Sequence, residues 1–229
     1  MSFTPLHCRG TAVRPPRRDP LELGQFALLS HDVHLLRLTG PAAGSTRAAR
    51  VPRPRNAAPM TRRARSPNFD DAAFRRALGQ FATGVTIITT RTTDGHPIGF
   101  TASSFNSVSL DPPLVLWSLA KRSASMPVFR ANSHYVVNVL AASQLDLCRR
   151  FASVKGDRFE GVSHEAGDTG MPVLEGALAW FECHNRSRYD EGDHVIFVGE
   201  VERCGVRGDA AEVGPLVFQS GLFHKLQAL

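Results

Sequence analysis

Three hydroxyl side chains lie within a short stretch, GFTASSF, at residues 99–105. Thr101, Ser103 and Ser104 could donate hydrogen bonds to a phosphate group, while Gly99 and Ala102 are small enough to let a ligand approach the main chain. The same residue types would also suit a plain strand whose hydroxyls face water. The stretch therefore indicates either a site for a phosphorylated ligand or an ordinary polar strand.

A second polar group follows a predicted strand that ends at Ser118 and Ala120. Lys121, Ser123 and Ser125 then precede a predicted helix start. Serine and lysine side chains at a helix N-terminus are a common anion site, because the helix dipole and the first N–H groups attract negative charge. Ser123 could instead be an ordinary N-cap with exposed basic neighbours. A cap and a phosphate ligand are compatible.

His194 is the sharpest single candidate for chemistry. It stands in the tripeptide Gly–Asp–His, directly after a turn and at the start of a strand. A lone histidine after a turn is more often a surface residue than a functional one. Asp193 could be the turn residue that fixes this loop, without contacting a ligand.

The elements that must position these residues begin with a helix from Asp70. Asp70 and Asp71 suit the positive end of a helix, and Gly84 is expected to end it. One face of this helix is apolar at helical spacing and consists of Phe74, Ala77, Leu78 and Phe81. Two further short helices are predicted over 123–133, starting at a serine cap, and over 143–153.

The rest of the chain predicts strands. The β-branched run from Val85 leads through an Asp94–Gly95 turn into the GFTASSF stretch, and shorter strands flank a Pro112–Pro113 break. Residues 135–141 form another predicted strand. A long hairpin turns at residues 190–193, and two short strands near the C-terminus are expected to close the sheet. This succession predicts a closed or nearly closed antiparallel barrel with helices outside it.

The charge of the chain is concentrated at one end. The formal net charge is +6, and nine arginines against three acidic residues within 1–59 account for all of it. The remainder is neutral, so the folded domain is not expected to bind nucleic acid. Residues 1–65 are rich in Arg, Pro, Ala and Gly and predict a disordered extension, with the folded domain at 66–229.

Three interpretations of this extension stay open. It could be an Arg-rich targeting or nucleic-acid-binding arm, or an ordinary disordered tail. It could also be absent from the protein in the cell, with translation starting at Met60.

The four cysteines are widely spaced and form no metal-ligand pattern with histidines. We expect no metal site, and free thiols in the reducing cytoplasm rather than disulfides. No apolar run reaches the length of a membrane span, and no apolar stretch of a secretory signal follows the first residues.

Four segments together resemble a known family. They are GQFATGVTIITT with PIGFTASSFNSVSLDPPLVLWSL (79–90 and 97–119), KRSASMPVF (121–129), KGDRFEGV (155–162) and EGDHVIFVGEV (191–201). Their order, spacing and residues are similar to those of the flavin reductases of two-component monooxygenase systems, and the similarity covers essentially all of residues 69–225. The resemblance implies a mainly β fold, the flavin-binding split β-barrel, antiparallel and Greek-key-like with a few peripheral helices.

The resemblance also implies a set of site residues. The flavin would be bound largely through the main chain, and His194 would orient the nicotinamide. The implied flavin-binding residues are Gly99, Phe100, Thr101, Ala102, Ser103, Ser104, Ser118, Leu119, Ala120, Lys121, Ser123, Ser125, Arg158 and Phe159. Arg158 and Phe159 could equally anchor a loop, and Trp117 and Trp180 are expected in the core or an interface.

The implied activity is NAD(P)H-dependent reduction of FMN or FAD, with a homodimer passing the reduced flavin to a partner monooxygenase. The absence of a nucleophile elbow or paired carboxylates in the sequence agrees with hydride chemistry carried by cofactors. The ending PLVFQSGLFHKL departs from the family pattern at Phe223 and His224, so nicotinamide specificity does not transfer from there. The alternatives are another flavin-dependent oxidoreductase on the same scaffold (a ferric or quinone reductase, or an oxidase), or a non-enzymatic flavin-binding or redox-sensing module.

Overall fold

A computed structural model describes residues 66–153 and 156–227. The predicted extension of residues 1–65 lies outside the described residues. In the described part, no helix is both long enough and apolar enough to cross a membrane.

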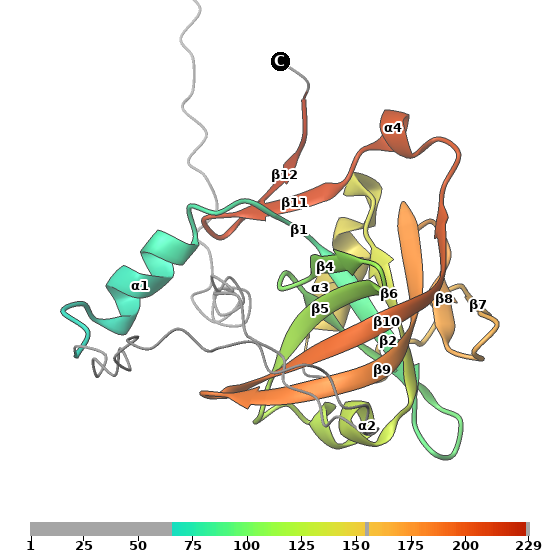
Figure 1. The fold of residues 1–229 in the computed structure, drawn as a ribbon. Coiled ribbons are helices and arrows are strands. Elements are labelled where there is room, and N and C mark those ends of the chain that lie inside the picture. The colour runs from blue at the N-terminus through green and yellow to red at the C-terminus, as the bar shows by residue number, and fades with distance from the viewer. Residues whose placement is uncertain (1–65, 154–155, 228–229) are drawn as a thin grey trace, which may run out of the picture.

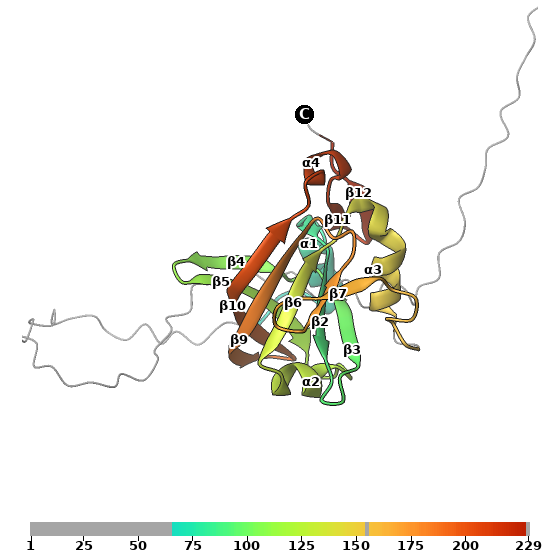
Figure 2. The same cartoon turned by 90° about the vertical axis from the view of Figure 1, so that its right-hand side faces the viewer.

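The centre of the molecule is a seven-stranded antiparallel sheet, in the order β3-β2-β6-β9-β10-β5-β4 (Figures 1 and 2). Its strands are β2 (Thr86–Arg91), β3 (Pro97–Ala102), β4 (Asn106–Leu110), β5 (Pro113–Ala120), β6 (His134–Val139), β9 (Ala179–Glu191) and β10 (His194–Val206). The edge strands β3 and β4 are consecutive in the chain, so the sheet curls enough to bring the end of β3 close to the start of β4. This confirms the predicted antiparallel barrel with Greek-key-like connections.

Two small sheets accompany the barrel. One contains β1 (Thr83–Gly84), β11 (Leu216–Gln219) and β12 (Leu222–Lys225), and the other β7 (His164–Ala166) and β8 (Pro172–Leu174). The prediction that the C-terminal strands close the main sheet is wrong. Val85 N donates to Leu216 O and Leu216 N donates to Leu140 O, so β11 docks beyond the ends of β2 and β6 rather than along them. β1, β7 and β8 were not predicted.

Helix α1 (Asp71–Leu78) begins where predicted but ends early. Asp70 is its N-cap and accepts a hydrogen bond from Ala73 N at 2.6 Å. The helix stops at Gly79, not at Gly84, and Phe81 lies outside it. Glycine is a weak helix former, and Gly79 O instead accepts from Ser220 N, which starts the chain toward β1.

The other helices are also shorter than predicted. The helix expected over 123–133 is α2 (Met126–Ala131), because Ser123 Oγ accepts from Ser125 N and makes a turn ahead of it. Ser125 occupies the N-cap position without a side-chain bond. The helix expected over 143–153 is α3 (Leu145–Ala152), preceded by the 3-10 turn η2 (Ala142–Gln144). A last short helix, α4, spans Ala210–Val213.

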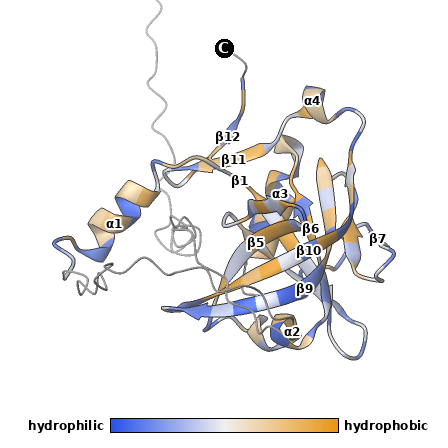
Figure 3. Ribbon diagram, in the orientation of Figure 1, coloured by the Kyte–Doolittle hydropathy of each residue, from blue (hydrophilic) through white to orange (hydrophobic). Residues whose placement is uncertain are grey.

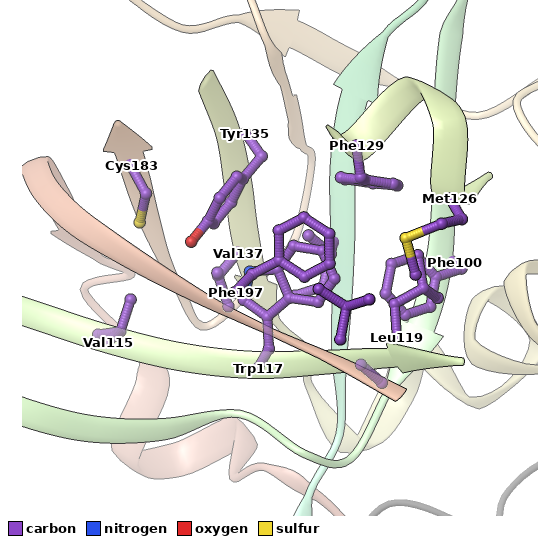
Figure 4. Packing of buried hydrophobic residues seen from close by; sticks show 13 residues of the cluster. Phe100, Val115, Trp117, Leu119, Met126, Phe129, Tyr135, Val137, Cys183 and Phe197 are labelled. Atoms are coloured by element: carbon purple, nitrogen blue, oxygen red, sulfur yellow. The ribbon is translucent and has the colours of Figure 1, made fainter. Parts of the chain in front are cut away.

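The barrel interior is filled by an aromatic cluster (Figure 4). The ring of Trp117 stacks on Phe197 with centroids 4.2 Å apart, and Tyr135 meets Trp117 edge-on at 5.2 Å. Phe129 comes from α2 and contacts Phe100, Trp117 and Phe197. Each aromatic pair adds about 1 kcal/mol beyond area burial, so α2 closes one end of the barrel with substantial stabilisation. Trp117 is therefore a core residue, as predicted.

A second core lies between the outside of the barrel and α3. It contains Val85, Ile87, Leu140, Cys148, Phe151, Phe159, Leu174 and Leu216. Strand β2 is buried on both faces, since Ile88 enters the interior cluster while Ile87 enters this outer one. The strand β3 beside it is consequently held from inside by aromatic rings and from outside by α3.

Candidate functional site

The predicted stretch 99–104 runs along β3 and just past its end, and residues 99–103 are buried. A Cβ added to Gly99 would lie 2.9 Å from Ile88 O and 3.0 Å from a ring carbon of Phe151. A glycine is thus required by close packing of α3 on β3. Gly99 was predicted to let a ligand approach the main chain, and in the structure it lets the Phe151 ring of α3 pack closely on β3.

Two side chains of this stretch are committed to the fold. Phe100 belongs to the interior aromatic cluster. Thr101 Oγ1 donates to Cys148 O in α3 at 2.7 Å. Burial raises the pKa of the Cys148 thiol to about 12, so that side chain stays neutral and Cys148 contributes through its carbonyl. Because these two side chains are engaged in the fold, Phe100 and Thr101 could contact a ligand only through the main chain.

The end of the stretch connects β3 to β5. Ser104 Oγ accepts from Ser118 N at 3.0 Å and contacts Ser118 O at 3.3 Å. Leu119 points into the interior cluster, and Ala120 pairs with His194 across the β5–β10 ladder. The structure therefore brings the first, second and fourth predicted segments to one end of the barrel.

Lys121 is tied to the turn between β9 and β10. Its main-chain N donates to Asp193 O at 2.9 Å, and its Nζ donates to Gly192 O at 2.9 Å. Nζ also lies 3.5 Å from Asp190, which pairs with Arg130 of α2 at 2.7 Å. Ser123 N donates to Ala120 O, so the segment predicted for the phosphate wraps around the strand end.

His194 is buried at the start of β10 rather than exposed as a turn residue. Its Nδ1 lies 2.7 Å from Asp193 Oδ1. Gly192, with φ of +54°, provides the left-handed backbone that this tight turn requires. The aspartate that the sequence suggested as a turn residue thus contacts the histidine directly.

Arg158 and Phe159 come from the third segment. Arg158 Nη1 donates to Gly99 O at 2.8 Å, which places the guanidinium beside β3. Phe159 packs edge-on against Phe151 at 4.9 Å in the outer core. Phe159 is therefore an anchor for this segment, whereas Arg158 joins the predicted site.

These contacts form one continuous path from Arg158 through β3, Ser104 and β5 to His194. The sequence identifies Phe151 and Cys148 as apolar residues of the predicted helix over 143–153, but it gives no signal for their contacts with β3. Asp193 had a signal, its place next to His194, but its contact with the imidazole depends on the conformation of the turn.

Two other observations bear on the site. A cleft of about 450 Å³ beside α3 is lined by Asp146, Leu147, Arg150, Gly161, Val162, Ser163, Glu175 and Gly176 and contains none of the predicted site residues. We favour the path of contacts over this open cleft, since only the path unites the predicted segments. Among the described residues, no three His, Cys, Asp or Glu side chains gather as a metal ion would need.

The residues present fit a phosphorylated flavin. Burial lowers the pKa of the Arg158 guanidinium, and no carboxylate forms an ion pair with it in the described part of the chain. A partly desolvated cation of this kind suits an anionic group. Arg158 therefore offers the donor chemistry that such a ligand requires.

An antiparallel split barrel with a polar site at the strand ends defines a flavin-binding class of protein. Residues 78–227 match the family model described as flavin reductase like domain, and the chain belongs to that family. The resemblance seen in the four sequence segments is thereby confirmed.

Relatives of known activity support this assignment. The chain is 49% identical over 154 residues to the FMN reductase (NADH) SmoA of Agrobacterium fabrum, covering 67% of this chain and 84% of SmoA. It is 40% identical over 156 residues to HsaB of Mycobacterium tuberculosis, the reductase subunit of a flavin-dependent monooxygenase, covering 68% and 82%. It spans only 46% of a probable flavin reductase of Rhizobium meliloti.

Solved structures agree with the fold. The NADH:FAD oxidoreductase SgcE6 of Streptomyces globisporus, in complex with NAD and FAD fragments, superposes with a TM-score of 0.64. The two chains are 36% identical over 69% of this chain and 93% of SgcE6.

Proposed function

We propose that this chain is a flavin reductase that transfers a hydride from NADH to FMN or FAD and supplies the reduced flavin to a separate monooxygenase. The observation that carries the proposal is the path of contacts joining Arg158, β3, Ser118 and His194 in a member of this family. Relatives named as an NADH-dependent FMN reductase and as a monooxygenase reductase subunit support the activity, the cofactors and the kind of partner expected from the sequence.

The hydride chemistry is supplied by the nicotinamide and the flavin themselves. The chain's own task is to hold the two rings about 3–3.5 Å apart and to exclude water. Main-chain groups at the end of β3 and of β5 orient one ligand, and the cations Arg158 and Lys121 balance the charge of its phosphate. His194, which pairs with Ala120 across the β5–β10 ladder, orients the nicotinamide at the same end of β5.

The decisive experiment follows NADH and NADPH oxidation by the full-length protein with FMN, FAD and riboflavin in turn. We expect turnover that scales with added flavin and favours NADH. Tight flavin binding without turnover would support a non-enzymatic module. A substrate-dependent product formed without added flavin would support an oxidase. Either result would overturn the reductase assignment.

His194 is tested by His194→Ala in the same assay. We expect the KM for NADH to rise at least about tenfold, a loss of about 1.4 kcal/mol of binding, while the affinity for flavin stays within about twofold. An unchanged KM for NADH would remove His194 from the nicotinamide site.

We further propose that the protein is a homodimer and that α1 packs on the second copy. No residue of α1 is buried, and Phe69, Phe74 and Phe81 on the helix and its flanks are all exposed. The helix, which has an apolar side, stands away from the barrel (Figure 3). A short helix gains most of its stability from packing such a face, and the sheet edge at β4 presents a further exposed residue, Leu110.

The dimer is tested by light scattering on Phe81→Ser, which removes a ring that is 68% exposed. The control is Val206→Ser, since Val206 is an equally exposed apolar residue at the far end of β10, 75% exposed. We expect only Phe81→Ser to shift the mass toward the monomer. A wild-type monomer, or equal effects of both changes, would show that α1 does not bind a second copy.

A cytoplasmic location also fits the chain. Cys148, Cys183 and Cys204 are free thiols, which a reducing compartment preserves.

A further inference from the structure

The contact between Asp193 and His194 joins two very different environments. The His194 side chain is 9% exposed, whereas the Asp193 side chain is 81% exposed, yet Oδ1 and Nδ1 are 2.7 Å apart. The imidazole lies at the end of the barrel among the predicted site residues. The carboxylate approaches one of its nitrogens from the solvent side.

This contact determines where the imidazole carries its proton. An ionised carboxylate can only accept hydrogen bonds, so the hydrogen between the two atoms belongs to Nδ1. In the neutral ring, Nε2 is then the unprotonated nitrogen and acts as an acceptor. Without the carboxylate, a neutral imidazole can carry its proton on either nitrogen.

The main chain around Asp193 holds this arrangement in place. Asp193 O accepts from Lys121 N, and Gly192 O accepts from Lys121 Nζ, both at 2.9 Å. The ladder fixes His194 opposite Ala120. Both partners of the contact are therefore attached to the end of β5, where the predicted flavin-binding segment turns toward α2.

We propose that Asp193 is a positioning residue that keeps the proton of His194 on Nδ1, so that Nε2 accepts a hydrogen bond from the carboxamide N–H of the nicotinamide. The inference rests on the proposed role of His194 at the nicotinamide. An amide N–H is a donor, and only the Nδ1-protonated tautomer presents a complementary lone pair at Nε2. Carboxylates that orient a functional histidine through its other nitrogen act in the same way in metal sites.

A merely structural role makes a different prediction. An exposed carboxylate contributes little to stability, typically below about 1 kcal/mol. If Asp193 served only the turn, its removal would change the stability slightly and leave the imidazole tautomer as it was. The tautomer is thus the readout that separates the two roles.

The experiment measures the tautomer of His194 by ¹⁵N NMR in the full-length protein without ligands, at alkaline pH where imidazoles are ordinarily neutral. The His194→Gln spectrum assigns the signal. Asp193→Ala removes the acceptor, and Asp193→Asn keeps an acceptor oxygen without the charge. Glu191→Gln removes a charge from the same hairpin and is the control.

We expect the wild type, Asp193→Asn and Glu191→Gln to show the Nδ1-protonated form, and Asp193→Ala to gain the other tautomer. In parallel, Asp193→Ala should raise the KM for NADH about tenfold without changing the KM for flavin, and Asp193→Asn should recover most of this loss.

Two results would overturn the proposal. An unchanged tautomer in Asp193→Ala would show that the carboxylate does not fix the proton, whatever the kinetics. A changed tautomer with an unchanged KM for NADH would show that the tautomer does not serve the nicotinamide. Failure of the flavin reductase assignment itself would be visible separately, as an inactive wild type with an intact Asp193–His194 contact in NMR.

Discussion

The two halves of the candidate site are built by different forces. The β3 half, residues 99–104, is held by close packing between the aromatic cluster and α3, and two of its side chains are buried in or bonded to the fold. The hairpin half, which consists of Asp190, Gly192, Asp193 and His194 with Lys121, is held by hydrogen bonds and ion pairs of partly exposed groups. Changes in the first half should therefore appear as lost stability, and changes in the second as altered kinetics.

The largest effect is expected from Gly99→Ala. The new methyl group would meet Ile88 O and the Phe151 ring, and overpacking of this kind costs about 1–3 kcal/mol. Denaturant unfolding measures the loss. Gly208→Ala is the control, since nothing lies within 4 Å of the added Cβ there, and we expect a change below about 0.5 kcal/mol. Equal effects at both glycines would contradict the packing account of β3.

A smaller loss is expected from Thr101→Val, which keeps the shape of the side chain but removes the hydrogen bond to Cys148 O. Loss of this buried hydrogen bond costs about 0.5–1.5 kcal/mol, again measured by unfolding. Thr93→Val, in the exposed turn between β2 and β3, should change stability by less than about 0.5 kcal/mol. A stable Thr101→Val protein would imply that α3 is held on β3 by packing alone.

The smallest effect on stability belongs to Lys121→Met in the hairpin half. Its ion pair with Asp190 is partly exposed, so we expect a loss below about 1 kcal/mol. The kinetic readout is sharper, because FMN carries a phosphate and riboflavin does not. We expect the KM for FMN to rise several-fold and that for riboflavin to stay constant, as a charge-assisted contact to phosphate predicts. If both rise equally, Lys121 acts by holding the turn instead.

The sequence predicted the local elements well where the pattern of residues decides them. The strands from Val85 to Ala120 and the long hairpin follow from β-branched residues and turn signals, and the N-terminus of α1 follows from Asp70. The same reasoning extended α1 to Phe81, because the apolar spacing continues past Gly79. The helix stops at Gly79 because glycine is a weak helix former and because Gly79 O accepts a hydrogen bond from Ser220 N, more than a hundred residues away in the chain.

The sequence by itself determined the class of fold and the family, and it predicted which segments carry the site, since hydroxyls, glycines and a histidine in register are local properties of the chain. It could not decide which side chains face a ligand. Only the tertiary structure shows that Phe100 and Phe159 are buried in the two cores, that the Thr101 hydroxyl donates to Cys148 O in α3, and that Asp193 contacts His194. Those outcomes depend on contacts between distant segments, and such contacts leave no pattern in the neighbouring residues.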